Sequence, residues 1–181
     1  MAPRGQTPHA GLTADEFSAR FQAGARVFWT LAAGLVGDPI EAEDVCQEAY
    51  LAAHDKRAQF DPATNFQAWM GRFVRNVAAN ERRKRARRRT EPSDPFVLDE
   101  SGPAPAAADE RLFDPEAFDE RLLAALGTLG EVPRACLLLR VLREQSYAEI
   151  ATLLEIPEGT AMSHVHRART ALRAFLEDSG T

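Results

Sequence analysis

The sequence is poor in cysteine and in long apolar runs, and each shortage excludes a class of protein. Only 2 cysteines, Cys46 and Cys136, occur among the 181 residues, and neither belongs to a CxxC pair. A disulfide scaffold is therefore excluded, and both thiols are expected to be buried as small apolar groups. No apolar run approaches the roughly 18 residues of a membrane span, and the N-terminus has no hydrophobic signal segment. We expect no stable membrane insertion and a cytoplasmic location.

Charge is distributed very unevenly along the chain, although the formal net charge is only −5. Residues 1–90 have a net charge of +4, residues 91–120 one of −9, and residues 121–181 one of zero. The acidic stretch is rich in proline and alanine and has no sustained period, which is typical of an extended linker. Just before it, residues 82–89 carry 7 positive charges in 8 positions. Such a run is typical of a solvated tail or of a surface that binds nucleic acid.

The hydrophobic period is helical in every periodic segment, and no strand pattern occurs, so the predicted fold class is all-α. We predict two helical domains, at residues 12–89 and 114–177, joined by a flexible acidic linker at residues 90–113. Residues 1–11 are predicted to be disordered. A linker of about 25 residues spans at most roughly 80 Å when extended, which is enough to separate two DNA elements by two helical turns.

Three helices are predicted in the first domain. Thr13 and Glu16 form a capping box before a helix that ends at Gly37, and Asp38-Pro39 starts the second helix. At 100° per residue, one face of the second helix is apolar and the opposite face is acidic with a single leucine. The acidic face is typical either of a solvated surface or of a docking surface for a basic partner. The apolar face holds Ala42, Cys46, Ala49, Tyr50 and Ala53, and the acidic face holds Glu41, Asp44, Glu48, Leu51 and Asp55.

The third helix is predicted to begin near Asn65, after a loop at residues 56–65. One side is an apolar stripe, whereas the other is basic and continues into the charged run. Because each neutralised phosphate releases condensed counterions, a basic helix face of this kind suits a DNA backbone. The stripe contains Phe66, Trp69, Met70, Phe73, Val74 and Val77, and the basic side contains Arg72, Asn76, Arg83 and Arg87.

The second domain has the pattern of a helix-turn-helix. Asp114-Pro115 is predicted to cap its first helix, and Pro133 lies in the first turn of the next. Ser146 and Glu149 form a second capping box before a short helix at residues 147–154, which a turn joins to a last helix from about residue 158 to 176. A short helix, a turn of three to four residues and a longer basic helix are typical of DNA-binding proteins.

Two stretches of the chain, taken together, resemble the sigma-70 family of transcription initiation factors. Residues 38–50 (DPIEAEDVCQEAY) and 60–76 (FDPATNFQAWMGRFVRN) are similar to the family's second conserved domain. Residues 146–151 (SYAEIA) and 156–169 (IPEGTAMSHVHRAR) are similar to its fourth domain. A chain with only these two domains resembles the extracytoplasmic-function (ECF) subgroup. The resemblance covers roughly residues 12–89 and 115–176.

The resemblance implies a role for each surface in promoter-directed, stress-responsive transcription. The partners it implies are core RNA polymerase, through its β′ clamp helices and β flap, promoter DNA, and an anti-sigma factor. It implies polymerase binding by Asp44, Gln47, Glu48 and Leu51. Contact with the −10 element, including a flipped base during melting, is implied for Phe60, Asp61, Thr64, Asn65, Trp69, Arg72, Arg75, Asn76 and Arg83. Contact with the −35 element is implied for Thr160, Ser163, His164, His166, Arg167 and Arg169.

Two positions depart from the family pattern. Glu155 stands in the helix-turn-helix turn where family members often have glycine, and a non-glycine residue in a left-handed conformation costs about 1–2 kcal/mol. His164 stands where a basic residue is common, so its fixed positive charge is weaker. We expect these two residues to affect the turn and the −35 preference, respectively.

Two other functions fit parts of the sequence. A stand-alone helix-turn-helix repressor or activator would dimerise and read an operator without polymerase, although it needs neither the acidic helix nor the long linker. A metal-dependent nuclease could use Glu41, Asp44 and Glu48. We predict no enzymatic activity, no cofactor and no metal site, because the chain has no phosphate-binding glycine loop and no HExxH motif, and because its four histidines are scattered.

Overall fold

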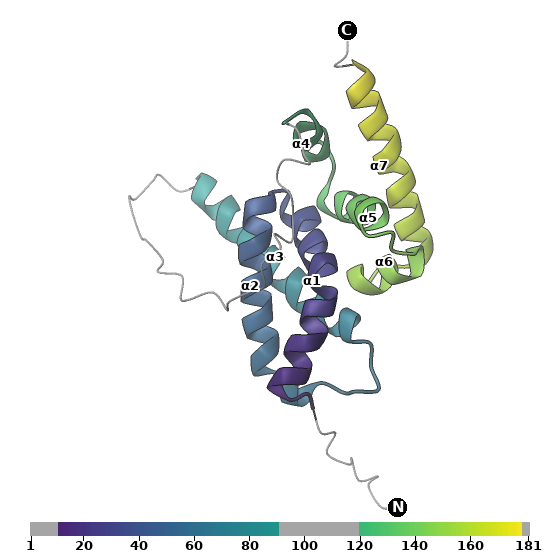
Figure 1. The fold of residues 1–181 in the computed structure, drawn as a ribbon. Coiled ribbons are helices and arrows are strands. Elements are labelled where there is room, and N and C mark those ends of the chain that lie inside the picture. The colour runs from purple at the N-terminus through teal and green to yellow at the C-terminus, as the bar shows by residue number, and fades with distance from the viewer. Residues whose placement is uncertain (1–10, 91–119, 179–181) are drawn as a thin grey trace, which may run out of the picture.

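The computed structural model describes residues 11–90 and 120–178, and within them the chain is built from helices alone (Figure 1). The predicted all-α fold class is confirmed. The predicted disordered N-terminus before Gly11, the linker beyond Thr90 and the Asp114-Pro115 cap lie outside the described residues. The elements are α1 (Ala14–Val36), α2 (Pro39–Asp55), the 3-10 helix η1 (Arg57–Gln59), α3 (Phe66–Thr90), α4 (Glu120–Gly127), α5 (Glu131–Leu142), α6 (Tyr147–Leu154) and α7 (Glu158–Asp178).

The helix boundaries follow from the caps that the sequence contains. The Thr13 backbone N–H donates to Glu16 Oε2 at 2.9 Å, and the Glu16 N–H donates to Thr13 Oγ1 at 3.2 Å. Ser146 and Glu149 make the same reciprocal pair at the start of α6. Gly37 ends α1 in a left-handed conformation with φ of 83°, which glycine adopts without steric cost. Both predicted capping boxes and this helix end are confirmed.

An aromatic cluster forms the centre of the first three helices. Phe17 is completely buried, and its ring lies 5.2 Å from that of Tyr50 and 5.9 Å from that of Phe66, measured between centroids. The predicted buried face of α2 is confirmed, with Tyr50 only half-buried and Val45 as an additional buried residue. The opposite face of α2 is therefore left outside the core.

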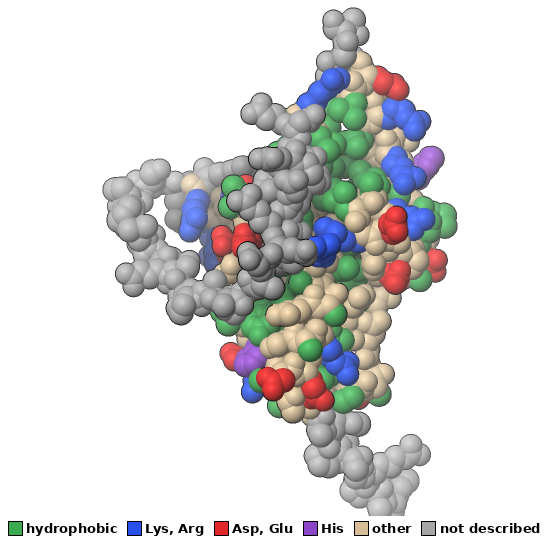
Figure 2. All heavy atoms as spheres, viewed as in Figure 1, with side chains coloured by type: hydrophobic (Ala, Val, Ile, Leu, Met, Phe, Trp, Pro, Cys, Tyr) green, Lys and Arg blue, Asp and Glu red, His purple; other side chains and the backbone are tan. Residues whose placement is uncertain are grey.

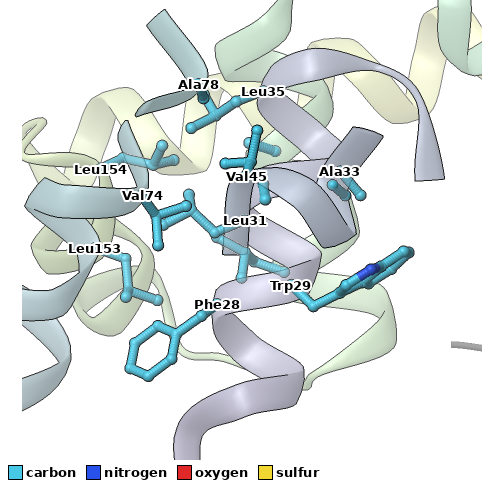
Figure 3. Packing of buried hydrophobic residues seen from close by; sticks show 14 of the residues in the cluster. Phe28, Trp29, Leu31, Ala33, Leu35, Val45, Val74, Ala78, Leu153 and Leu154 are labelled. Carbon is cyan, nitrogen blue, oxygen red and sulfur yellow. The ribbon is translucent and has the colours of Figure 1, made fainter. Parts of the chain in front are cut away.

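The helices before and after the acidic stretch pack against each other and share one hydrophobic core. Figure 3 shows Leu153 and Leu154 of α6 beside Val74 of α3, close to Leu31 of α1. The helical periodicity of the chain did not predict these contacts. We call α1–α3 the first half and α4–α7 the second half of the closed molecule.

A glycine and a buried arginine hold α5 against the end of α1. A Cβ atom on Gly34 would lie 2.7 Å from the Cβ of Ala135, so the two helices approach as closely as their backbones allow. Arg134 Nε donates to the Gly34 carbonyl at 2.8 Å, and Nη1 donates to the Leu129 carbonyl at 3.2 Å. Burial is the main cause that lowers the pKa of Arg134. Its charge nevertheless lies at a helix C-terminus, where unpaired carbonyls favour a cation.

Replacing Gly34 with valine is expected to separate the two halves. The added side chain would overlap the backbone of Ala135, and overpacking of this kind typically costs about 1–3 kcal/mol. Helix α1 itself should persist, since valine is a better helix former than glycine. Small-angle X-ray scattering should show a larger radius of gyration than for the wild type, with helical circular dichroism unchanged. An unchanged radius of gyration would contradict the close approach.

Candidate nucleic-acid interface

Helix α7 presents a polar and basic face that is held in place by a buried stripe. Ala161, Val165 and Ala168 are buried on one side of the helix. On the other side, Ser163, His166, Arg167 and Arg169 are exposed, whereas Thr160 and His164 are half-buried. Figure 2 shows basic side chains and a histidine along the outer edge of α7. The helix-turn-helix therefore exposes four of the six residues that the family resemblance implied for contact with the −35 element.

Tyr147 of α6 completes this surface and was not predicted as part of it. Together with Ser163 and Arg167 it lines an open depression on α7, and the Arg140 guanidinium lies 5.2 Å from its ring centroid. The available signal was its place directly after the capping serine, at the start of the first helix of the helix-turn-helix. A tyrosine at this point offers a hydroxyl to a phosphate or a base edge.

His164 is the least polar of the candidate contacts. Its Nδ1 is buried and has no hydrogen-bond partner among the described residues. Burial, with a smaller contribution from Arg167, lowers the pKa of His164 below the ordinary value of the imidazole. The side chain is therefore less readily protonated than a free imidazole and is a weaker source of positive charge for a DNA phosphate than an arginine at this position would be.

The loop before α3 is organised by its own polar side chains. Asp61 Oδ1 accepts from the Ala63 N–H at 2.9 Å, and Thr64 Oγ1 donates to the Asp61 carbonyl at 2.7 Å. Asn65 caps α3 by accepting from the Ala68 N–H at 3.1 Å. Thr64 and Asn65 are exposed and Asp61 is half-buried. The loop thus holds polar groups at the helix start, where backbone N–H groups attract anions.

Phe60 differs from the other candidates in this loop because it belongs to the core. Its side chain is fully buried, and its ring centroid lies 5.2 Å from that of Trp69 and 5.7 Å from that of Phe66. In this arrangement the ring cannot reach a DNA base. The structure gives Phe60 the role of fixing the loop against α3, and the half-buried Trp69 lies nearer to the surface.

The basic side of α3 is partly occupied by contacts within the protein. Arg72, Asn76 and Arg83 are exposed, whereas the Arg75 side chain is only 17 % exposed. In the charged run, Arg82 pairs with Glu131 of α5, and Arg85 pairs with Glu41 of α2. The basic side of α3 therefore serves two purposes in this structure, because it presents positive charge and it also contacts both neighbouring helices.

The acidic face of α2 is open except at Glu41, which pairs with Arg85 of α3. Asp44 and Glu48 are exposed, Gln47 is half-buried, and the Leu51 side chain is 58 % exposed. Ile40, which is 80 % exposed, lies on the same side, since four residues advance a helix by little more than one turn. The sequence analysis missed Ile40, although its position one turn before Asp44 was a usable signal. A row of carboxylates with an exposed apolar residue at each end is suited to a partner with a basic, partly apolar surface.

Neither a metal cluster nor a membrane helix occurs in the described part of the chain. Residues 11–90 and 120–178 contain no group of three or more histidine, cysteine, aspartate or glutamate side chains that could hold a metal ion. No helix within these residues is long and apolar enough to cross a membrane. The described surface is therefore characterised by its charged helix faces.

These features define a class of protein: a helix-turn-helix DNA-binding protein with a second basic helix and a separate, exposed acidic helix face. Family models support this class, since residues 21–88 match Sigma-70 region 2 and residues 119–172 match Sigma-70, region 4. The ECF RNA polymerase sigma factor SigL of Mycobacterium tuberculosis is 38 % identical over 159 residues, which are 86 % of each chain. The chain belongs to the ECF family of RNA polymerase sigma factors. It is a transcription initiation factor that directs RNA polymerase to promoters.

Solved structures have the same fold. The sigma factor RpoE from Bartonella quintana, in complex with the anti-sigma factor NepR, is 25 % identical with a TM-score of 0.66, over 90 % of this chain and 98 % of that one. CnrH, in complex with the cytosolic domain of CnrY, has a TM-score of 0.62 and 22 % identity, over 93 % and 92 % of the two chains. The arrangement of helices described above is thus a known one.

Proposed function

We propose a division of labour among three surfaces of this sigma factor. The acidic face of α2 binds the β′ clamp helices of core RNA polymerase, α3 and the loop before it contact the −10 element, and α7 reads the −35 element. The observation that carries this proposal is the exposure, on one chain and in the family's order, of an acidic face followed by two basic helices. The free chain has a net charge of −5, which disfavours tight binding to DNA without polymerase.

The polymerase surface comprises Asp44, Gln47, Glu48 and Leu51, and we add Ile40 because it shares their face. The carboxylates in the row between Ile40 and Leu51 would orient the factor on a basic partner, since charge complementarity sets register and association rate. Ile40 and Leu51, at the two ends of this row of residues, would each add apolar contact area that is desolvated on binding. The second half would bind the β flap.

The −10 surface comprises Asp61, Thr64, Asn65, Trp69, Arg72, Arg75, Asn76 and Arg83, with Phe60 as a support beneath the loop. The arginines would neutralise phosphates, and the polar loop would hold a base extruded from the duplex. Extrusion costs a few kcal/mol, which stacking and edge contacts must offset.

The −35 surface comprises Thr160, Ser163, His164, His166, Arg167 and Arg169, and we add Tyr147. An arginine is the commonest reader of guanine in the major groove, through paired hydrogen bonds to O6 and N7. Arg167 and Arg169 are the only arginines among the six −35 positions, and both are exposed. They are therefore expected to contribute most of the −35 binding.

The remaining parts of the proposal concern the domain boundaries, the cellular location and a protein partner. The domains are proposed to span residues 12–89 and 114–177, joined by the acidic linker at residues 90–113. We place the protein in the cytoplasm, without a catalytic step of its own. Because the structure of the related sigma factor RpoE contains the anti-sigma factor NepR, we propose that an anti-sigma factor binds this chain as well.

Run-off transcription with core RNA polymerase and a library of genomic promoter fragments tests the proposal. The chain is expected to co-elute with core enzyme in size exclusion and to produce transcripts from a subset of fragments sharing two elements. Core enzyme alone is the control and should give no such transcripts. Tight operator binding by a free dimer, without co-elution, would instead support a stand-alone repressor.

A further inference from the structure

The turn between α6 and α7 lies directly on α3 and is bound there by one arginine. Glu155 Oε1 lies 2.6 Å from Arg75 Nη2 and 3.5 Å from Arg72 Nε. The other terminal nitrogen of Arg75 donates to the backbone carbonyl of Leu153. A Cβ on Gly71 would lie 3.1 Å from that same carbonyl oxygen, so a larger residue at position 71 would crowd this contact. The two halves are thus joined here by an ion pair, by a hydrogen bond to the backbone, and by a close approach of the two backbones at Gly71.

Glu155 holds this contact from an unfavourable backbone position. Its φ is 53°, a left-handed conformation that costs a residue with a Cβ about 1–2 kcal/mol relative to glycine. Among the described residues, Glu144 is the one other non-glycine with positive φ, and it also has φ of 53°. Glu144 is exposed and makes no ion pair with another described residue. The comparison separates the backbone strain, which both glutamates have, from the contact, which only Glu155 makes.

The contact occupies a side chain that the proposed function assigns to DNA. The Arg75 side chain is 17 % exposed, whereas that of Arg72 is 67 % exposed. A carboxylate of Glu155 and a phosphate oxygen of DNA would use the same guanidinium face, since both accept paired hydrogen bonds from arginine. Arg75 therefore cannot serve the −10 element fully while the halves are closed.

We propose that Glu155 is a latch: its carboxylate holds Arg75 in place of a DNA phosphate and thereby keeps the free factor closed and unable to engage −10 DNA. The acidic face of α2 stays open in the same structure, with Asp44 and Glu48 exposed. Polymerase can consequently dock on the closed form, and DNA binding follows after opening. If only a fraction of the molecules is open, the apparent affinity for −10 DNA equals the intrinsic affinity multiplied by that fraction.

The latch is tested first by a distance measurement on the free chain. Fluorophores on cysteines introduced at two exposed positions, Gln59→Cys in the first half and Ala171→Cys in the second, report closure by energy transfer. Burial raises the pKa of the native Cys136 thiol to about 12 and that of Cys46 further, so both should label slowly. Glu155→Gly is expected to raise the open-to-closed ratio about tenfold at low salt, as loss of a charge-assisted hydrogen bond implies.

Glu144→Gly is the matched control, because it removes one carboxylate and one strained residue without touching Arg75. It should leave the energy transfer at the wild-type value. Glycine suits the left-handed position, so Glu155→Gly should fold at least as well as the wild type. Wild-type energy transfer in Glu155→Gly would overturn the latch.

A second measurement tests what the latch occludes. The free chain is titrated with a short double-stranded DNA of random sequence at low salt, and Glu155→Gly is expected to bind several-fold more tightly than Glu144→Gly, which has the same net charge. Equal affinities would show that Arg75 is not withheld from DNA and would overturn the occlusion. The inference rests on the proposed role of Arg75. Neither measurement contains polymerase, so failure of polymerase docking would be detected separately.

Discussion

The double variant Asp44→Arg, Glu48→Arg is expected to lose binding to core RNA polymerase. Both side chains are exposed on the acidic face of α2, so the helix and the core behind it should be unaffected. The change replaces two negative charges with positive ones opposite a partner surface that we propose to be basic. Close contacts between like charges across an interface cost several kcal/mol. We expect binding to weaken by roughly a hundredfold or more, measured by size exclusion and by fluorescence titration with core enzyme.

The control for this prediction is Glu144→Arg, Glu177→Arg. Both glutamates are exposed, and the double replacement changes the net charge by the same amount. Glu144 lies between α5 and α6 and Glu177 lies near the end of α7, so neither belongs to α2 and polymerase binding should remain close to wild type. Equal binding by the Asp44–Glu48 variant and this control would remove α2 from the polymerase contact.

The second large effect is expected for Arg167→Ala, Arg169→Ala on α7. Each arginine supplies either a phosphate contact or a base contact, and a base contact contributes about 1–3 kcal/mol of discrimination. Transcription from a promoter with both elements should fall at least about tenfold. The slope of log affinity against log salt concentration should become shallower by about one per lost phosphate contact. Run-off transcription and salt titrations of promoter binding by the holoenzyme measure the two effects.

Arg173→Ala provides the matched control on the same helix. Arg173 is exposed but lies farther along α7 than the polar residues at its start. Its loss should reduce transcription much less than the double replacement. On a promoter with a scrambled −35 element, wild type and double variant should give equally weak transcription. A persisting difference there would mean that the two arginines act elsewhere than on the −35 element.

Much of the fold could be predicted because its determinants are local. The Thr13–Glu16 and Ser146–Glu149 capping boxes each connect residues three positions apart, and Gly37 ends α1 by its own backbone freedom. The helix-turn-helix could be predicted for the same reason, since its turn and its buried stripe lie within one short segment. The candidate DNA contacts on α7, in contrast, came from the resemblance to the sigma-70 family.

The parts that sequence reasoning missed depend on packing. Phe60 is an aromatic residue in a loop, which suggested that it could stack on a DNA base. In the structure it is buried, because the rings of Trp69 and Phe66 pack against it. Ile40 was overlooked because it stands in the first turn of α2, although its helical spacing from Asp44 places it on the acidic face. Glu155 was expected to alter the turn because of the cost of a left-handed conformation, yet it adopts that conformation with φ of 53°, and its ion pair with Arg75 was not predicted.

The sequence by itself determined the helices, their caps and the charge carried by each helix face, because these depend on residues within one or two turns of one another. Only the tertiary structure decided that the two halves close on each other. Arg134 reaches the carbonyl of Gly34 across 100 positions of sequence, and Arg75 reaches that of Leu153 across 78. Contacts at such separations form only where the surfaces of two folded helical units are complementary. Neither the hydrophobic period of the sequence nor its composition contains information on that complementarity.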